Sequence, residues 1–366
     1  MHSTTRVQLD LAALRHNYNQ IKQIADSSKA YAVVKSDAYG HGLLRIAKGL
    51  HDADGFALIQ MDDLRALRES GIWKPVLLLE GVMDASDLLD AAILKAEVVL
   101  RSEAQLQMIE KTSVALKQPL AIWLKVNTGM NRFGFPPAQI EEVMQRLASN
   151  SSVKLKGVMT HFACADDLDC EIEGQWRVFH EVVRRYQLPF TAANSAAILR
   201  DQRTHGEVVR AGSLIYGNNP FSQAMPVGYD FRPVMSLRSE IIGLSNLQKG
   251  DALGYGASFV ADRPMLIGLV GCGYGDGYPY TAPTGTPVLV KGNLTRVVGK
   301  VAMNVMAVDL TEVGRVGLGD PVVLWGDHQL PISEVSKYSG VLSEALECGL
   351  TKRLPVCLIG EESIFA

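Results

Sequence analysis

The stretch Ala30-Tyr31-Ala32-Val33-Val34-Lys35-Ser36-Asp37-Ala38-Tyr39-Gly40-His41-Gly42 shows the pattern that decides the fold of the first part of the chain. Its first five residues form a short apolar run typical of a buried parallel strand, and a glycine-rich loop follows. The same kind of run recurs up to about residue 220. The eight runs are Ala30–Val34, Gly55–Ile59, Pro75–Leu79, Glu97–Leu100, Leu120–Val126, Leu155–Phe162, Phe190–Asn194 and Val208–Tyr216.

Segments with a helical period lie between these runs. Apolar residues return every three or four positions in Asp62–Gly71, Ser86–Lys95, Ser102–Leu116, Pro137–Ser149 and Cys170–Gln187. Asp62 and Ser102 are residue types that cap the free backbone N–H groups at the start of a helix. Eight strands that each lead into a helix predict a (β/α)8 barrel of the TIM type over residues 1–228 rather than an open doubly wound sheet.

The pattern changes after Asn218-Asn219-Pro220, where glycine, proline and β-branched residues alternate. This pattern predicts a second domain over residues 229–366, built mainly of antiparallel strands that form a barrel or a sandwich. The segment Arg6–Leu11 alternates like a strand ahead of an expected helix at Ala12–Ala25, so residues 1–11 could pair with the later domain. The expected strands of that domain are Met235–Leu244, Pro264–Gly271, Pro287–Val298 with a turn at Gly292 and Asn293, Val301–Leu310 and Pro321–Trp325.

Composition and charge exclude several classes of protein. The 366 residues are 47% hydrophobic and 20% charged, which excludes a disordered or fibrous chain. Lys plus Arg (36) against Asp plus Glu (39) gives a net charge of −3 without a basic block, so nucleic acid is not an expected partner. No run is long enough to span a membrane, and the polar opening Met1–Arg6 favours the cytoplasm. Five cysteines without a CxxC pair favour reduced thiols.

The working residues of such a barrel are expected at the carboxyl ends of its strands. Lysine at the end of the first run, Lys35, can act as a nucleophile toward carbonyl compounds if its site is protected from water. Loops after the seventh and eighth strands of barrels often bind phosphate, and small residues stand at both places here. A lysine and a phosphate cradle at one mouth predict a site for pyridoxal phosphate. The residues placed at strand ends are Lys35 and Tyr39, Lys125 and Arg132, His161, Asn194 and Ser195, and Arg210, Gly212 and Ser213.

Several motifs in register resemble the alanine racemase family over nearly the whole chain. The matching segments are Tyr31–Gly42, Lys125–Gly134, Thr160–Phe162, Ala193–Ala196, Val209–Gly217, Gly254–Gly256, Gly273–Tyr278 and Val301–Leu310. The resemblance implies a racemase that interconverts L-alanine and D-alanine by two bases, working as a cytoplasmic homodimer with shared active sites. Such an enzyme either supplies D-alanine or breaks alanine down.

The resemblance also implies roles for individual residues. The two catalytic bases are Lys35, which holds the cofactor, and Tyr255, which comes from the other subunit. Arg210 faces the pyridine nitrogen of the cofactor, and His161 is expected between Arg210 and Tyr255. The cofactor-binding set is Lys35, Tyr39, His161, Ser195, Arg210, Gly212, Ser213 and Tyr216. The substrate-binding set is Arg132, Met303 and Tyr274, and Lys125 is a candidate for carbamylation.

The sequence departs from the family pattern around the substrate pocket. The family commonly has Ser or Cys before the methionine at 303 and Asp after it, whereas this chain has Ala302 and Asn304. Lys352 stands where some members have an active-site tyrosine. These departures bear on substrate range, so a serine or broad-specificity racemase is the main alternative.

Other classes stay open as weaker alternatives. They are a basic amino acid decarboxylase, a non-catalytic carrier of pyridoxal phosphate and a purely structural barrel. No metal is expected, because His161-x-x-Cys164 lacks a second pair of ligands. The glycines at 273, 275 and 277 do not match a nucleotide loop.

Overall fold

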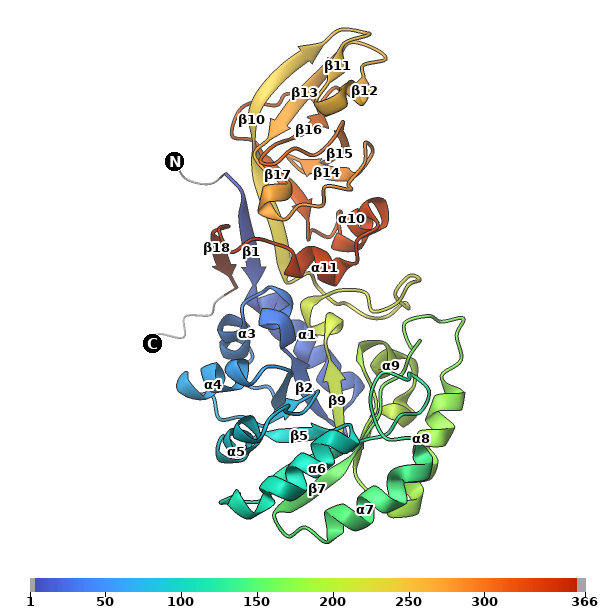
Figure 1. Cartoon of the computed structure of the whole chain (residues 1–366). Helices are drawn as coiled ribbons and strands as arrows, with labels where there is room; N and C mark the ends of the chain where they lie inside the picture. Colours follow the sequence, from blue (N-terminus) through green and yellow to red (C-terminus); the bar gives the residue numbers. More distant parts are fainter. Residues whose placement is uncertain (1–3, 361–366) are drawn as a thin grey trace.

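A computed structural model describes residues 4–360 and consists of two units joined end to end (Figure 1). The first unit is the predicted barrel of eight parallel strands, in the order β8-β7-β6-β5-β4-β3-β2-β9. Two backbone bonds join the outer pair and close the ring, from Glu207 N to Phe190 O (2.9 Å) and from Arg210 N to Ala193 O (3.0 Å). The strands are β2 (Lys29–Val33), β3 (Gly55–Leu58), β4 (Val76–Leu78), β5 (Glu97–Leu100), β6 (Leu120–Lys125), β7 (Val153–Met159), β8 (Phe190–Thr191) and β9 (Val208–Ala211).

Helices surround this barrel and begin close to the predicted segments. Ser102 caps α6 by accepting a hydrogen bond from Gln105 N, as predicted. The prediction for Asp62 was wrong, because α4 begins at Met61 with Gln60 as its cap, and Asp62 lies in the first turn. The helices are α1 (Leu11–Ile24), α2 (Lys35–Tyr39), α3 (Leu43–Gly49), α4 (Met61–Glu69), α5 (Ala85–Ile93), α6 (Glu103–Thr112), α7 (Ile140–Ala148), α8 (Glu173–Tyr186) and α9 (Ser195–Arg200).

The apolar runs are explained by burial on both faces of the barrel wall. Side chains alternate along a strand, so Tyr31 and Val33 point inward while Ala30 and Ala32 face the helices. The interior is a small cluster of Tyr31, Val33, Ala57, Leu77, Val99, Trp123, Met159 and Val208. A strand with apolar neighbours on both sides reads as a continuous hydrophobic run, which is the signal that predicted the fold.

The second unit is a sheet domain with a closed antiparallel barrel. β10 pairs with both β13 and β17, which completes a ring in the order β10-β13-β16-β15-β14-β17. Its strands are β10 (Met235–Leu247), β13 (Met265–Val270), β14 (Pro287–Val290), β15 (Asn293–Val298), β16 (Met306–Asp309) and β17 (Pro321–Trp325). A hairpin of β11 (Ala252–Leu253) and β12 (Phe259–Val260) extends from its far end (Figure 1).

The first strand of the chain belongs to the sheet domain. β1 (Arg6–Asp10) pairs antiparallel with β10, with Val7 opposite Leu237. On its other side β1 pairs in parallel with β18 (Val356–Ile359), near the end of the described chain. The expected division of the chain between residues 228 and 229 stays a prediction.

Some of the observed elements differ from the expected ones. Strand β9 ends at Ala211, and residues Ser213–Tyr216 form the 3-10 helix η4 because the chain turns at the barrel mouth. Residues 301–305 are a loop, so β16 covers only the second half of Val301–Leu310. The sheet domain also contains two unexpected helices, α10 (Ile332–Ser339) and α11 (Ser343–Cys348).

The expectation of reduced thiols was wrong for one pair. Cys164 and Cys170 form a disulfide within the loop between β7 and α8, while Cys272, Cys348 and Cys357 are free. Sequence spacing did not predict this bond because the loop folds back through four carbonyl contacts to Arg200, at residues 164, 165, 167 and 170.

The disulfide gives a direct prediction. Purified, unreduced protein titrated with a thiol reagent in denaturant should show three thiols, and the same protein after reduction should show five. The variant Cys170→Ser should show four before and after reduction, since its former partner becomes free. Five thiols in the unreduced wild-type chain would contradict the assignment.

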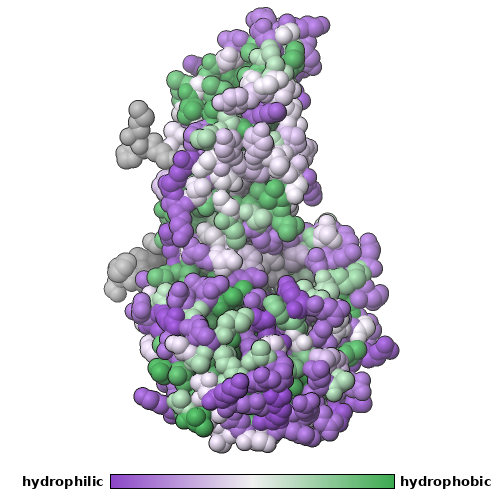
Figure 2. All heavy atoms as spheres, in the orientation of Figure 1, coloured by the Kyte–Doolittle hydropathy of each residue, from purple (hydrophilic) through white to green (hydrophobic). Residues whose placement is uncertain are grey.

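The molecular surface differs between the two units. Figure 2 shows hydrophobic residues gathered on parts of the sheet domain, whereas hydrophilic residues cover much of the barrel. Exposed large hydrophobic residues of the sheet domain include Ile242, Leu244, Tyr255, Val260, Tyr274, Tyr280, Leu294 and Met303. Across residues 4–360, no helix combines the length and apolar character needed to cross a bilayer.

Candidate active site

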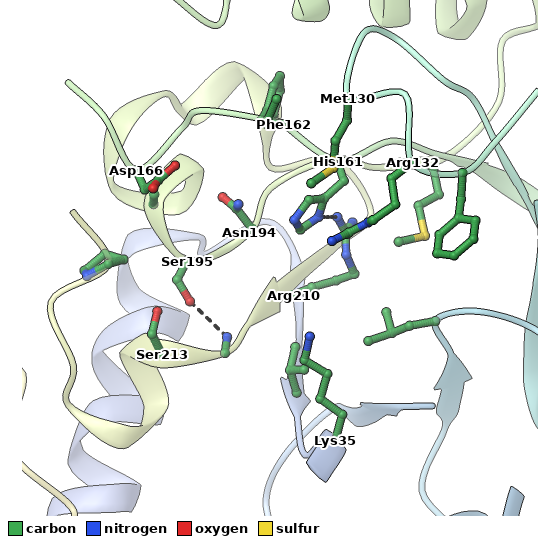
Figure 3. A pocket seen from close by; sticks show the side chains of 18 of the residues that line it. Lys35, Met130, Arg132, His161, Phe162, Asp166, Asn194, Ser195, Arg210 and Ser213 are labelled. Carbon is green, nitrogen blue, oxygen red and sulfur yellow. Dashed lines mark hydrogen bonds between the residues drawn. The ribbon is translucent and has the colours of Figure 1, made fainter. Parts of the chain in front are cut away.

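A cavity of about 290 Å³, open to solvent, lies at the carboxyl ends of the barrel strands (Figure 3). Its wall carries four cations, Lys35, Lys125, Arg132 and Arg210, and two carboxylates, Glu80 and Asp166. The excess of positive charge in this cavity suits an anionic ligand. Sequence reasoning missed Glu80 and Asp166. Glu80 directly follows the predicted strand Pro75–Leu79, so the rule that found Lys35 also pointed to it.

Lys35 is carried by a backbone segment of unusual conformation. The next four residues, Ser36 to Tyr39, all have φ near +55°, although none of them is glycine. This left-handed conformation costs about 1–2 kcal/mol per residue and persists only where surrounding contacts hold it. Asp37 supplies two such contacts, because its side chain accepts from Leu43 N (2.8 Å) and its carbonyl accepts from Gly42 N (2.8 Å). The result is a half-buried lysine at a fixed place in the mouth.

Arg210 is fully buried and fixes the neighbouring histidine. Its guanidinium donates to the carbonyls of Thr160 (2.9 Å) and Ala192 (3.1 Å) and to His161 Nδ1 (3.4 Å, Figure 3). Burial lowers the pKa of Arg210 to about 9, which still leaves a cation at neutral pH. Because arginine can only donate, His161 Nδ1 accepts, and the proton of the neutral ring is on Nε2. Burial is the main cause that holds the pKa of His161 well below its usual range, and the nearby cations Arg210 and Lys125 lower it further.

The other side of the mouth has the features of an anion cradle. Ser195, Gly212 and Ser213 line the cavity, and Ser195 Oγ accepts from Gly212 N (2.9 Å, Figure 3). A Cβ at position 212 would lie 2.7 Å from the hydroxyl oxygen of Tyr39, so a larger residue there would push this hydroxyl aside. Asn194 caps α9 by accepting from Ala197 N. Phosphate binds to backbone N–H groups at the start of a helix, and small residues let it come close to them.

Tyr216 lies behind the cradle rather than in the cavity wall. It is fully buried, and its hydroxyl donates to Val33 O (2.9 Å). Its ring packs against Tyr39 with 4.9 Å between centroids. Tyr216, one of the predicted cofactor contacts, is therefore placed to support the side chain of Tyr39.

Lys125 and Arg132 line the same cavity as Lys35. Lys125 is 6% exposed, and its ammonium group lies 5.6 Å from the ring centre of Phe133. Burial, followed by the nearby cations Arg210 and Arg132, lowers the pKa of Lys125 to about 8. A sizeable fraction of this amine is consequently uncharged near neutral pH and able to react as a nucleophile.

Three predicted site residues lie in the sheet domain, away from this cavity. Tyr255 begins η5 (Tyr255–Ala257) between β11 and β12, at the end farthest from the barrel, and is 74% exposed (Figure 1). Tyr274 and Met303 are neighbours, because Gly275 N donates to Met303 O (2.7 Å) and Tyr274 N donates to Ala302 O (3.0 Å). Within one chain, the structure therefore does not bring Tyr255 to Lys35.

A closed (β/α)8 barrel with a lysine and an anion cradle at its mouth, followed by an antiparallel sheet domain, defines a two-domain enzyme that acts on a small anionic compound. Two family models divide the chain between them. The model of the alanine racemase N-terminal domain matches residues 9–220, and that of the C-terminal domain matches residues 234–358. The chain belongs to the alanine racemase family, whose members are racemases that use pyridoxal phosphate.

Full-length relatives and solved structures agree with this assignment. The chain is 43% identical to an alanine racemase of Laribacter hongkongensis, over 97% of this chain and 98% of the relative. It is 41% identical to a catabolic alanine racemase of Pseudomonas putida, over 97% and 99%. The crystal structure of the biosynthetic alanine racemase from Pseudomonas aeruginosa superposes with a TM-score of 0.91 at 38% identity, covering 97% of this chain and 99% of that one.

Proposed function

We propose that this chain interconverts L-alanine and D-alanine, with pyridoxal phosphate bound at the barrel mouth and Lys35 and Tyr255 as the two proton-transfer groups. The supporting observation is one cavity that collects Lys35, Arg210 and the Ser195–Gly212–Ser213 cradle. When bound, pyridoxal phosphate withdraws electrons from the substrate and so acidifies its α-hydrogen. The cradle suits a phosphate group, because Ser195, Gly212 and Ser213 are small and Ser195 begins α9.

The groups of the proposed site have distinct tasks. Lys35 Nζ holds the cofactor and then moves a proton on one face of the substrate. Arg210, a donor only, would lie at the pyridine nitrogen of the bound cofactor without giving up a proton. His161 Nε2 carries a proton and can donate a hydrogen bond to the phenolate oxygen of Tyr255. A phenol needs such stabilisation of its anion to act as a base at neutral pH. Arg132 and the backbone of Met303 hold the substrate carboxylate, and Tyr274 lines the entrance.

The proposed active enzyme is a homodimer with shared sites. Tyr255 is exposed at the far end of the sheet domain, so it reaches a barrel mouth only if a second copy lies head to tail against the first. Exposed hydrophobic residues such as Tyr255 and Met303 support an interface on this domain. Sedimentation of the purified protein should give twice the mass of one chain.

The assay that tests the function uses both enantiomers of alanine and of serine, followed by chiral chromatography. We expect equal final mixtures of L- and D-alanine from either start, with serine slower. Ala302 and Asn304 keep a serine or broad-specificity racemase as the second candidate. Equal rates for serine and alanine would favour it. The choice between D-alanine supply and alanine breakdown is tested by growth of a deletion strain with and without D-alanine.

A cytoplasmic location is also part of the proposal. The disulfide Cys164–Cys170 is an observation against it, because such bonds are more typical of an oxidising compartment. Cell fractionation is the measurement that checks the location.

Lys125 is the proposed site of a carbamate, formed when its neutral amine attacks CO2 and releases a proton. Because the pKa of Lys125 is about 8, the neutral fraction rises with pH, at least about fivefold between pH 7 and pH 8. With ¹³CO2 held at constant pressure, a carbonyl signal in the NMR spectrum should grow in the same direction. The signal should be absent from Lys125→Arg. A signal that does not change with pH would contradict the proposal.

A further inference from the structure

A buried carboxyl group from the sheet domain lies under the segment that carries Lys35. Glu347, on α11, is 2% exposed. Its backbone oxygen lies so close to the barrel that a Cβ on Gly40 would come within 2.5 Å of it. Glu347 Oε2 accepts from Asn218 Nδ2 (2.9 Å), and Oε1 lies 3.9 Å from His41 Nε2. The contact therefore joins the two units directly beside the turn after Tyr39.

His41 is the partner whose hydrogen bonding is incomplete. Its ring is fully buried, and Nδ1 lies 3.0 Å from both Ala38 O and Tyr39 O. Carbonyl oxygens only accept, so Nδ1 carries the proton. Burial lowers the pKa of His41 to about 4, which leaves Nε2 as an uncharged acceptor. Among the described residues, nothing within hydrogen-bond distance donates to this atom.

Glu347 is the group that can supply the missing donor. Burial raises the pKa of its carboxyl group well above the usual range, which favours the protonated acid. Asn218 already donates to Oε2, which leaves the proton on Oε1, the atom nearer to His41. A neutral acid facing a neutral imidazole avoids the cost of a charge in a site that water does not reach.

We propose that Glu347 is a positioning residue for Lys35: its carboxyl group closes a hydrogen bond to His41 Nε2, and His41 in turn holds the carbonyls of Ala38 and Tyr39. This chain of contacts ends in the left-handed segment Ser36–Tyr39, which needs outside support. Tyr216 packs on the same ring of His41, with 4.4 Å between centroids. The sheet domain thus helps to fix the conformation in which Lys35 meets the cavity. The functional part rests on the proposed role of Lys35, whereas the contact itself is testable alone.

Two substitutions separate hydrogen bonding from size. Glu347→Gln keeps an acceptor for Asn218 and places an amide donor toward His41. The methionine in Glu347→Met has a similar length but offers neither an acceptor to Asn218 nor a donor to His41. Amide hydrogen exchange of the purified full chain, resolved at Ala38, Gly40, His41 and Gly42, should speed up at least about tenfold in Glu347→Met and stay within about threefold in Glu347→Gln. These four amides are bonded within the segment, to the carbonyls of residues 34, 36, 38 and 37.

The matched control is Leu346→Ala on the same helix. Leu346 is also 2% exposed but packs in the core of the sheet domain. The variant Leu346→Ala should lower the melting temperature without speeding hydrogen exchange at the four amides. The proposal is overturned if Glu347→Met leaves exchange at the wild-type rate, if Glu347→Gln exchanges as fast as Glu347→Met, or if Leu346→Ala speeds the same amides.

A double substitution tests the route through His41. The side chain of His41→Asn still reaches the carbonyls that Nδ1 contacts, but it has no counterpart of Nε2. In that background, Glu347→Met should add less than about twofold to exchange. Fully additive effects would overturn the route. Release of pyridoxal phosphate during gel filtration is the functional readout, expected to be faster in Glu347→Met than in Glu347→Gln. A wild-type chain that binds no cofactor would reject the proposed function and leave the exchange result valid.

Discussion

The variant Lys35→Ala should be colourless and should lose at least about 10³-fold of alanine racemase activity. Its amine is the proposed attachment point of the cofactor and one of the two proton-transfer groups, so a single change removes both tasks. The measurements are the absorption spectrum of the purified protein and racemisation from each enantiomer. Treating the wild-type protein with borohydride and then digesting it should leave the cofactor mass on the peptide that contains Lys35.

The control for this experiment lies on the same strand. Lys29 begins β2 at its opposite end, is exposed and pairs with Glu207 (2.8 Å). Lys29→Ala should keep the colour and the activity, because an exposed ion pair contributes little to stability. A coloured, active Lys35→Ala would refute the assignment of the site, whatever the family of the chain.

The variant Tyr255→Phe should lower racemisation about 10² to 10⁴-fold while the protein stays coloured. Only a hydroxyl is lost, and it lies at the exposed end of the sheet domain, so folding should not change. Racemisation should fall by the same factor in both directions, because the equilibrium constant between enantiomers is one, so the asymmetry is expected in exchange of the α-hydrogen. Exchange of the α-hydrogen with deuterated solvent should slow strongly for one enantiomer and less for the other, because Lys35 still serves one face. Equal exchange from both enantiomers would mean that two bases are not used.

Mixing variants tests whether the two groups come from different chains. Lys35→Ala and Tyr255→Phe are each expected to be nearly inactive. After dissociation and reassociation, a mixed dimer contains one intact site, so a random mixture should recover about a quarter of wild-type activity. The control is Lys35→Ala mixed with Arg210→Ala, since both changes lie in the barrel and no intact site forms. No recovery in the first mixture would indicate a site built within one chain.

The barrel was predictable because its strands are buried on both faces. Runs such as Ala30–Val34 and Leu120–Val126 therefore stand out from the polar loops and the helices with their period of about 3.6 residues. The rule that active sites lie at strand ends then located Lys35, Lys125, His161, Ser195 and Arg210, all of which line the observed cavity. The same rule fits Glu80, which directly follows the run Pro75–Leu79.

Other features had no local signal. The left-handed segment Ser36–Tyr39 contains no glycine, and the contacts that hold it come partly from residues more than 170 positions away, such as Tyr216. Helix α11 is only six residues long, so its period is too short to recognise. The disulfide depends on how the loop around Arg200 folds. Each of these is decided by tertiary contacts, which sequence spacing does not record.

The pairing of β1 has a consequence for synthesis on the ribosome. Its two neighbours, β10 and β18, are made more than 220 residues later, and β18 is the last of the described strands to be made. The barrel strands can assemble while Arg6–Asp10 still has no partner. An unpaired strand edge on a nascent polypeptide attracts other chains. Demand for chaperones should therefore last until β18 has emerged, and deleting this strand should burden the cell more than its four residues suggest.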